Sequence, residues 1–298
     1  MLAEKIIQTS KQFSKRGLPL TRVLERLQIA RSCFYYQQKR KEGSSDGYIR
    51  QRIRELAMTY KAYGYKKVTV LLKAEGFKVN HKRVYRIWKE EGFNRYIFSK
   101  SKKRYKRREK EFNPTPATYT GEIWAIDFIH DSLENGRSFR VFNVIDVYSR
   151  RAFEPIIDLS ISGKKVTEHL EGLFKRYGAP KMIRRDDGPE FKSKYFQALM
   201  ARWDIEQEVI PPGQPFNNGH IESFHNLLRR ECLNREVFID IMEARDKIKS
   251  WIEDYNTKRL HSALGYWVPM KIWEARNELK NHRKTNTNIN GVQVRGSL

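Results

Sequence analysis

The chain has 298 residues with a hydrophobic content of 39%, which allows two or three folded domains and excludes a wholly disordered protein. No apolar run is long enough to span a membrane, and the first residues lack the apolar core of a secretory signal. The formal net charge of +24 predicts a polyanionic partner, and we expect nucleic acid rather than an anionic membrane surface.

The positive charge is concentrated in the N-terminal part of the chain. Residues 1–120 hold 31 Lys and Arg against 10 Asp and Glu, a balance of +21, which leaves only +3 for the remaining residues. Such asymmetry predicts that the N-terminal part binds the polyanion and that residues 121–298 have a different role.

The first element pair, within residues 5–38, reads as helix, turn and helix. Apolar residues of the first helix share one face, and Ser32 can cap the second helix, which carries Arg31, Tyr35 and Tyr36. This pattern is typical of a helix-turn-helix that contacts DNA, and a plain helical hairpin is the alternative. We assign residues 1–45 to this module.

A second helical module is predicted for residues 46–98, with three helices between about 47 and 94. Asn80 is a good N-cap for the last of these, which should end at Gly92. The last helix places basic side chains beside two aromatic ones: Lys82, Arg83, Arg86, Tyr85 and Trp88. The basic side chains predict contacts with DNA phosphates and base edges, whereas a solvated basic face is the alternative.

Residues 99–120 are predicted to be a linker. Eight of the eleven residues in 100–110 are basic, which favours a segment that lies along phosphates. The candidate DNA contacts in this run are Lys102, Lys103, Arg104, Lys106, Arg107 and Arg108.

From residue 121 the pattern changes to strands. We expect three strands at 122–133, 138–150 and 151–158, a helix at 163–177, a strand at 180–186, a helix at 192–203 and a strand at 204–210. Two helices should follow at 218–235 and 240–256. This order predicts an α/β domain with a mixed five-stranded sheet over residues 121–275, similar to the ribonuclease-H-like fold, followed by a tail at 276–298.

Three carboxylates stand out in this domain. Asp127 lies inside an apolar strand, where an unpaired charge is costly unless a hydrogen bond or a metal ion satisfies it. Asp186 ends the fourth strand, and Glu222 lies in the following helix with 35 residues between the two. Each has an ordinary alternative role, as a turn residue or an exposed helix carboxylate, but the joint spacing is the signature of retroviral integrases and transposases.

Two further features accompany Glu222. Arg229 follows it by seven residues, nearly two helical turns, so both lie on one helix face and Arg229 can contact a phosphate near the acids. His220 and His225 flank Glu222, but their spacing places them on different helix faces and argues against a zinc site.

The chain resembles the OrfB transposases of the IS-three group of bacterial insertion sequences. The matching stretches are WAIDF (124–128), VIDVYSR (144–150), RRDDGPEF (184–191), PGQPFNNGHIESFHNLLRRECLN (212–234) and YNTKRLHSALGYWVP (255–269), with a helical module at 63–93. The resemblance implies that Asp127, Asp186 and Glu222 are the catalytic, metal-binding acids. It places Asp187 where the family often has Asn, which implies a turn role for Asp187, and Arg229 where many members have Lys.

The resemblance also implies the chemistry and the partners. Two Mg²⁺ or Mn²⁺ ions would support cleavage and strand transfer of double-stranded DNA at insertion-sequence ends. A homo-oligomer on DNA and a fusion or partnership with the product of a preceding reading frame are expected. A catalytically silent DNA-binding protein derived from a transposase and a ribonuclease-H-like nuclease are the alternatives.

The expected location is the bacterial cytoplasm, with association with the nucleoid when the protein is bound to DNA. The two cysteines, Cys33 and Cys232, are far apart and predict neither a disulfide framework nor a thiolate zinc site. Such cysteine usage is typical of a reducing compartment.

Overall fold

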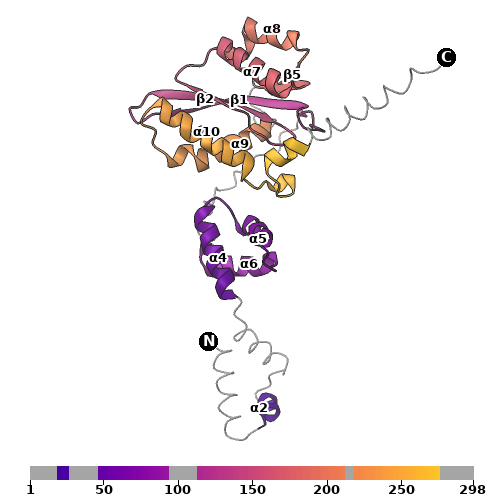
Figure 1. The fold of residues 1–298 in the computed structure, drawn as a ribbon, viewed down its shortest axis with the longest axis vertical. Coiled ribbons are helices and arrows are strands. Elements are labelled where there is room, and N and C mark those ends of the chain that lie inside the picture. The colour runs from indigo at the N-terminus through magenta and orange to yellow at the C-terminus, as the bar shows by residue number, and fades with distance from the viewer. Residues whose placement is uncertain (1–18, 27–45, 94–112, 212–217, 276–298) are drawn as a thin grey trace, which may run out of the picture. The chain divides into compact units, whose positions relative to one another are not determined.

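A computed structural model describes residues 19–26, 46–93, 113–211 and 218–275 of the chain. The chain divides into two compact units, Met1–Lys100 and Ser101–Leu298 (Figure 1). The division falls inside the basic linker predicted for residues 99–120, and the finer division into five parts stays a prediction. Of the first predicted module, the structure describes the helix α2 (Leu20–Arg26), in which Val23 and Leu24 are buried.

The second helical module contains α4 (Asp46–Thr59), α5 (Tyr65–Ala74) and α6 (His81–Glu90), as the sequence predicts. Its helices pack through apolar side chains that are fully buried, namely Ile53, Val68, Leu72, Val84 and Ile87. The Asn80 side chain caps α6 by accepting a hydrogen bond from the Arg83 N–H at 2.8 Å. Trp88, predicted to accompany the basic face of α6, is instead buried in this core with 6% exposure.

The second unit contains a five-stranded mixed sheet in the order β3-β2-β1-β4-β5. Its strands are β1 (Ile123–Ser132), β2 (Ser138–Asp146), β3 (Ile156–Asp158), β4 (Met182–Arg185) and β5 (Glu206–Val209). The pairs β1–β2 and β2–β3 are antiparallel, whereas β1–β4 and β4–β5 are parallel. The predicted order of elements is therefore confirmed, and the sheet has the ribonuclease-H-like arrangement.

All five strands are shorter than the sequence predicts, and the difference is largest for β2 and β3. β2 ends at Asp146, because its carboxylate accepts hydrogen bonds from the Ser149 N–H at 2.7 Å and from the Gly121 N–H at 2.6 Å. β3 begins only at Ile156, since Pro155 before it has no N–H to donate to a strand ladder.

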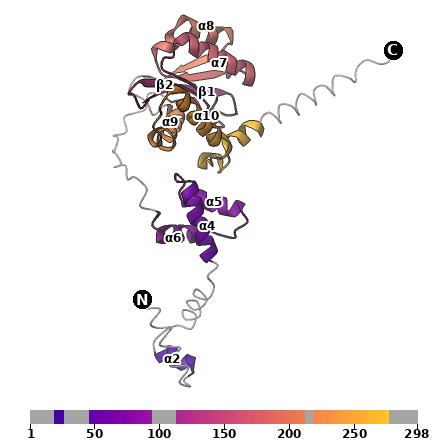
Figure 2. The same ribbon diagram turned by 60° about the vertical axis from the view of Figure 1, so that its left-hand side comes forward.

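Four helices cover the two faces of the sheet (Figures 1 and 2). α7 (Gly163–Tyr177) and α8 (Lys194–Arg202) cover one face, and α9 (Gly219–Glu231) and α10 (Ile241–Thr257) cover the other. The helix predicted for 218–235 ends at Glu231, where the chain turns so that Cys232 and Leu233 enter the core. Short 3₁₀ turns occur at Pro189–Lys192, Leu233–Arg235 and Ser262–Leu264.

Alternation along β1 distributes its side chains between the two layers. Ile123, Ala125 and Ile129 pack into the core beneath α9 and α10, whereas Trp124 and Ile126 pack into the core beneath α7 and α8. Asp127 belongs to the first series, so the pleat directs it toward the α9 layer.

The α10 layer is fixed to the sheet by a buried amide. Asn256 accepts a hydrogen bond from the Ala152 N–H at 2.9 Å and donates one to the Ala152 carbonyl at 2.8 Å. Losing this amide would leave two buried backbone groups unpaired.

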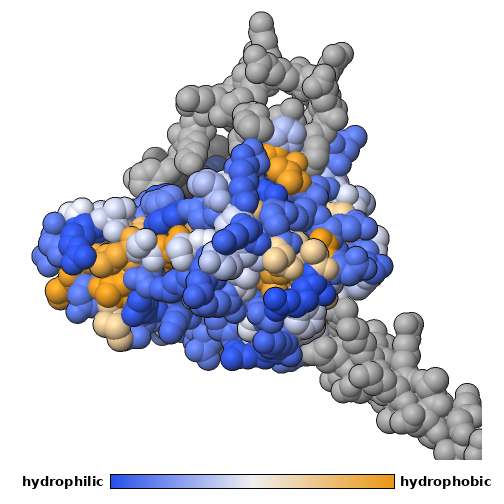
Figure 3. All heavy atoms as spheres, turned by 90° about the horizontal axis from the view of Figure 1, so that it is seen from above, coloured by the Kyte–Doolittle hydropathy of each residue, from blue (hydrophilic) through white to orange (hydrophobic). Residues whose placement is uncertain are grey.

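The outer surface is mostly hydrophilic on the face in Figure 3, with apolar side chains in separate patches. Of the helices that the structure describes, none is long and apolar enough to cross a bilayer.

Candidate active site

The parallel pairing of β1 with β4 brings the two predicted aspartates to one place. Ala125 of β1 is in register with Arg184 of β4, so the chains two residues further along bring Asp127 level with Asp186. Successive residues of a strand alternate between faces, and a step of two keeps both carboxylates on the same side of the sheet.

Asp127 is partly buried and lies close to other ionisable side chains. Its Oδ1 accepts a hydrogen bond from the Phe128 N–H at 2.7 Å, and its Oδ2 lies 3.6 Å from Nδ1 of His225. Burial, together with the negative charges of Asp186 and Glu222, raises the pKa of the Asp127 carboxyl to about 7, while the hydrogen bond from the Phe128 N–H acts in the opposite direction. The three acids predicted from the sequence therefore share one electrostatic environment.

The adjacent aspartates have different roles in the turn after β4. Oδ1 of Asp186 accepts a hydrogen bond from the Gly188 N–H at 3.1 Å, whereas Oδ2 of Asp187 pairs with Lys192 Nζ at 2.7 Å. Asp187 lies in the connection after β4, and the carboxylate that accepts the Gly188 hydrogen bond belongs to Asp186; the assignment of the metal ligand to Asp186 rather than Asp187 stays a prediction. A Cβ on Gly188 would lie 3.0 Å from Asp186 Oδ1, so a larger residue here would push against that carboxylate.

Glu222 reaches the site from α9. Ile221, Phe224 and Leu228 are buried against the sheet, which leaves Glu222 half-buried at the edge of the contact. Burial raises the pKa of Glu222.

Arg229 lies further along the same helix. It is exposed, and its Nη2 donates a hydrogen bond to the backbone carbonyl of His130 in β1 at 3.2 Å. The described contacts thus place Arg229 over the same strand that carries Asp127.

Two residues of this site were missed by sequence reasoning. Asn143 is in register with Asp127 across β1 and β2, and its Nδ2 lies 3.0 Å from Nε2 of His225. Burial lowers the pKa of His225 to about 4, and the charge of Arg229 acts in the same direction. The only sequence signal was that His225 follows Glu222 by three residues, which places both on neighbouring positions of one helix face.

A fourth carboxylate, Glu190, flanks the site and was also missed. A Cβ on Gly188 would lie 3.4 Å from Glu190 Oε2, so Glu190 borders the turn that carries Asp186. Its Oε1 pairs with Arg140 Nη1 at 2.5 Å, and the Arg140 guanidinium lies 4.1 Å from the centre of the Phe128 ring. Arg140 therefore neutralises Glu190 beside the three acids.

The donor set of this site fits a divalent cation. Asp127, Asp186 and Glu222 offer only carboxylate oxygens, which Mg²⁺ and Mn²⁺ prefer. A bound cation would relieve the repulsion that raises the pKa of Asp127. Within the described ranges, no three His, Cys, Asp or Glu side chains are already placed closely enough to hold a metal ion.

The candidate DNA-binding residues differ in their surroundings. Lys82 is exposed on α6, while Arg83 and Arg86 both pair with Asp46 at 2.7 Å. The remaining candidates lie outside the described residues: Arg31, Lys102, Lys103, Arg104, Lys106, Arg107 and Arg108.

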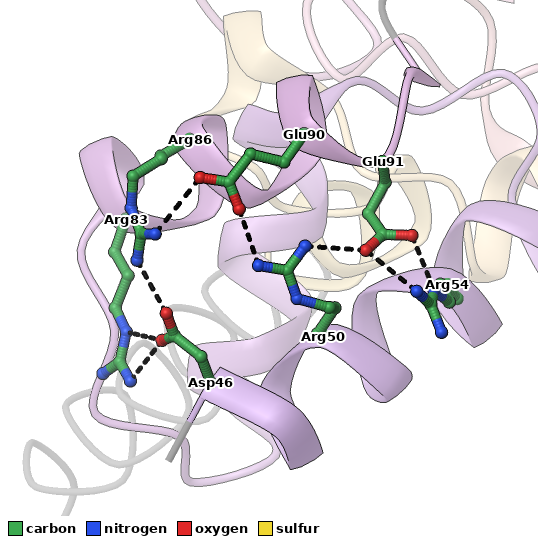
Figure 4. Close-up of polar contacts among 7 residues, drawn as sticks. All are labelled: Asp46, Arg50, Arg54, Arg83, Arg86, Glu90 and Glu91. Carbon is green, nitrogen blue, oxygen red and sulfur yellow. Dashed lines mark hydrogen bonds and ion pairs between the residues drawn. The ribbon is translucent and has the colours of Figure 1, made fainter. Parts of the chain in front are cut away.

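The pairing of Arg83 and Arg86 belongs to a network that connects α4 with α6 (Figure 4). Glu90 accepts from both Arg86 and Arg50, and Glu91 accepts from both Arg50 and Arg54. These contacts orient α6 on α4. Contact of Arg83 and Arg86 with DNA stays a prediction, and the network makes both weaker candidates than Lys82.

Comparison with known families identifies both units. Residues 117–215 and 203–269 each match a family described as an integrase core domain, and residues 46–105 match an HTH-like domain. The integrase core matches cover β1, β4 and α9, the three elements that carry the acids.

Relatives in bacterial insertion elements cover most of the chain. The "Insertion element IS407 uncharacterized 31.7 kDa protein" of Burkholderia multivorans is 34% identical over 82% of this chain and 86% of its own length. The "Transposase InsF for insertion sequence IS3A" of Escherichia coli is 24% identical over 82% of this chain and 90% of its own length. A chain of the simian T-cell lymphotropic virus intasome in complex with PP2A regulatory subunit B56 gamma aligns with a TM-score of 0.49 at 13% identity, over 74% of each chain.

The raised pKa of Asp127 predicts how pH affects the metal-free protein. Its carboxyl titrates at about 7 when folded against 3.8 ordinarily, so between these values the folded state keeps a proton that the unfolded state releases. The contribution of Asp127 to stability should therefore fall as pH rises from about 4 to 7 and stay lower above that. Asp127→Asn should raise the free energy of unfolding by about 1 kcal/mol or more at pH 8 and change it little at pH 4.

Urea unfolding in the presence of a chelator measures this difference. Asp131→Asn is the matched control, because it removes a carboxylate from the same strand outside the group of three acids. A stabilisation by Asp127→Asn that does not depend on pH would contradict the electrostatic explanation.

Proposed function

Since this chain belongs to the OrfB transposases of the IS-three group, which carry an integrase core, we propose that Asp127, Asp186 and Glu222 together hold two divalent cations for DNA cleavage and strand transfer. When bound, two such ions supply Lewis-acid activation of the attacking oxygen and stabilisation of the leaving oxygen. The observation that carries the proposal is that the register of β1 on β4 brings Asp127 level with Asp186, and that Asp186 and Glu222 both act electrostatically on Asp127.

The reaction has two phosphoryl-transfer steps. First, a water oxygen attacks a phosphodiester at the end of the element, the P–O3′ bond breaks, and the strand is left with a 3′-OH. That hydroxyl then attacks a phosphodiester of the target DNA, forming a new P–O bond as the original P–O3′ bond breaks. No covalent bond to the protein is required, and the chain's contribution is to hold charge and to position phosphates.

The proposed substrate is double-stranded DNA, bound mainly by the N-terminal part. The balance of +21 over residues 1–120 and the match to an HTH-like domain support this assignment. Both chemical steps act on two DNA ends, so we propose a homo-oligomer on DNA. A partnership with the product of a preceding reading frame belongs to the same proposal.

Two other functions predict different activities. A silent DNA-binding protein derived from a transposase would bind DNA without joining strands. A ribonuclease-H-like nuclease would cut RNA–DNA hybrids with the same acids. The complete set of acids disfavours the first, and the added helical module disfavours the second.

The adjacent aspartates provide the most direct test. Asp186→Asn removes an anionic ligand while keeping the side-chain shape, so it should abolish cleavage and strand transfer but spare DNA binding. Asp187→Asn should retain most activity, because Asp187 is exposed and pairs with Lys192. Mg²⁺-dependent strand transfer with the element's own ends measures both variants.

DNA binding measured in parallel separates loss of chemistry from loss of folding. Retained activity in Asp186→Asn would assign the metal site to other residues. Equal loss in both variants would indicate that Asp187 also contacts metal. Cleavage of an RNA–DNA hybrid without strand transfer would favour the nuclease.

Arg229 should position a phosphate beside the acids. Arg229→Ala is expected to slow strand transfer by about tenfold or more, because a charge-assisted contact to phosphate is lost. Arg230→Ala is the matched control, since Arg230 is equally exposed on α9 and pairs with the neighbouring Glu231 at 2.9 Å. Equal rates for the two variants would remove Arg229 from the site.

DNA binding should distinguish Lys82 from Arg86. For full-length protein on duplex DNA, Lys82→Ala should weaken binding and reduce the slope of log affinity against log salt by about 1. Arg86→Ala removes the same charge from α6, but its guanidinium already pairs with Asp46 and Glu90, so the slope should change less. A larger slope change for Arg86→Ala would reverse this ranking.

A further inference from the structure

His225 bridges a metal-binding candidate and a buried amide. Its Nε2 lies 3.0 Å from Asn143 Nδ2, and its Nδ1 lies 3.6 Å from Asp127 Oδ2. The His225 side chain is 12% exposed, so the imidazole is largely enclosed between α9 and the sheet. The position of His225 between Asp127 and Asn143 is therefore fixed by the packing of the fold.

The bridge follows from two registers that are fixed independently. The antiparallel pairing of β1 with β2 places Asn143 directly opposite Asp127. On α9, the buried neighbours Phe224 and Leu228 fix the rotation of the helix, so His225 faces the strand pair. One helical turn separates His225 from Glu222, so a single helix presents both residues to the same site.

Hydrogen-bond chemistry assigns the proton on the imidazole. The Asn143 side-chain nitrogen faces Nε2 of His225, and because an amide nitrogen can only donate, this orientation of the amide goes with an accepting Nε2. A neutral imidazole that accepts at Nε2 carries its hydrogen on Nδ1, and that hydrogen faces Asp127 Oδ2. The other oxygen of Asp127 already accepts from the Phe128 N–H.

We propose that His225 is a positioning residue that orients the Asp127 carboxylate for cation binding and is itself oriented by Asn143. The inference rests on the proposed function, since the cation belongs to that site. A carboxylate that is hydrogen-bonded at one oxygen and faces an imidazole nitrogen with the other is held near one orientation, so it loses less side-chain freedom when a cation binds. Partners that orient a ligand in this way contribute about 10-fold to 100-fold to metal affinity or activity.

Two substitutions of His225 separate its two contacts. The side-chain nitrogen of Asn is as many bonds from Cβ as Nδ1 of His, so His225→Asn keeps a donor toward Asp127. The side-chain nitrogen of Gln corresponds to Nε2, so His225→Gln keeps a polar group toward Asn143 and loses the donor toward Asp127. His225→Phe loses both and retains a ring of similar size.

The measurement is the affinity of the full-length, DNA-free protein for Mn²⁺ alone, followed by the electron paramagnetic resonance of the free ion. Asp127→Asn identifies the binding that belongs to this site. We expect His225→Gln and His225→Phe to weaken that binding about tenfold or more, and His225→Asn to stay within about threefold of wild type.

Nitrogen NMR of the imidazole in the metal-free wild-type protein tests the same inference without any variant. The expected result is a neutral ring with its proton on Nδ1, whereas a proton on Nε2 would overturn the assignment. If the Mn²⁺ affinity is unchanged in all three His225 variants, or is weakened more by His225→Asn than by His225→Gln, the inference is overturned while the proposed function stands. The absence of any Mn²⁺ binding sensitive to Asp127→Asn would overturn the proposed function with it.

Discussion

The parallel pairing of β1 with β4 is the constraint on which the candidate site depends. Consecutive strands of the meander are joined by short connections, but β4 reaches β1 only after the chain has crossed one face as α7. That crossover sets Ala125 opposite Arg184 and thereby brings Asp127 level with Asp186, although 58 residues separate them in sequence. A slip of one residue in this register would turn one carboxylate to the opposite face. The buried ion pair of Arg184 with Glu208 continues the same register into β5 and opposes such a slip.

The second constraint is the packing of α9 on the opposite layer from α7. Its apolar stripe is buried under the sheet, and the adjacent stripe carries Glu222, His225 and Arg229 at intervals of three and four residues. The acids from β1, β4 and α9 then repel one another, and burial adds to the cost of charging Asp127. Without a cation these acids destabilise the fold locally, and the proposed divalent cation would remove that cost. The same three acids thus provide the proposed chemistry and cause the electrostatic cost.

The sequence predicted the order of elements and the three acids because these depend on local signals. Apolar periodicity, the Asn80 cap and Gly92 locate helices, and the spacing of Asp186 and Glu222 is visible along one chain. It did not predict the partners of the acids. Asn143 meets Asp127 only through strand register, and Arg140 meets Glu190 across 50 residues. Ion pairs such as that of Arg86 with Asp46 likewise depend on tertiary packing. The sequence therefore predicted a basic face on α6, although the fold pairs part of that positive charge with acidic side chains.

The two parts of the chain, before and after residue 120, carry very different net charges. In the proposed function a cluster of carboxylates acts on phosphates that it would repel, and residues after 120 carry a balance of only +3 to offset that repulsion. On the same proposal, the excess of +21 before residue 120 would supply attraction that does not depend on DNA sequence, and a cation at the acids would remove the local repulsion. Within the helical module, ion pairs between α4 and α6 consume part of the charge to fix the helices, as in the pairing of Glu91 with Arg50 and Arg54. Exposed basic residues such as Lys82 are the ones we expect to contact phosphate. The proposed binding and the proposed chemistry thus depend on different residues.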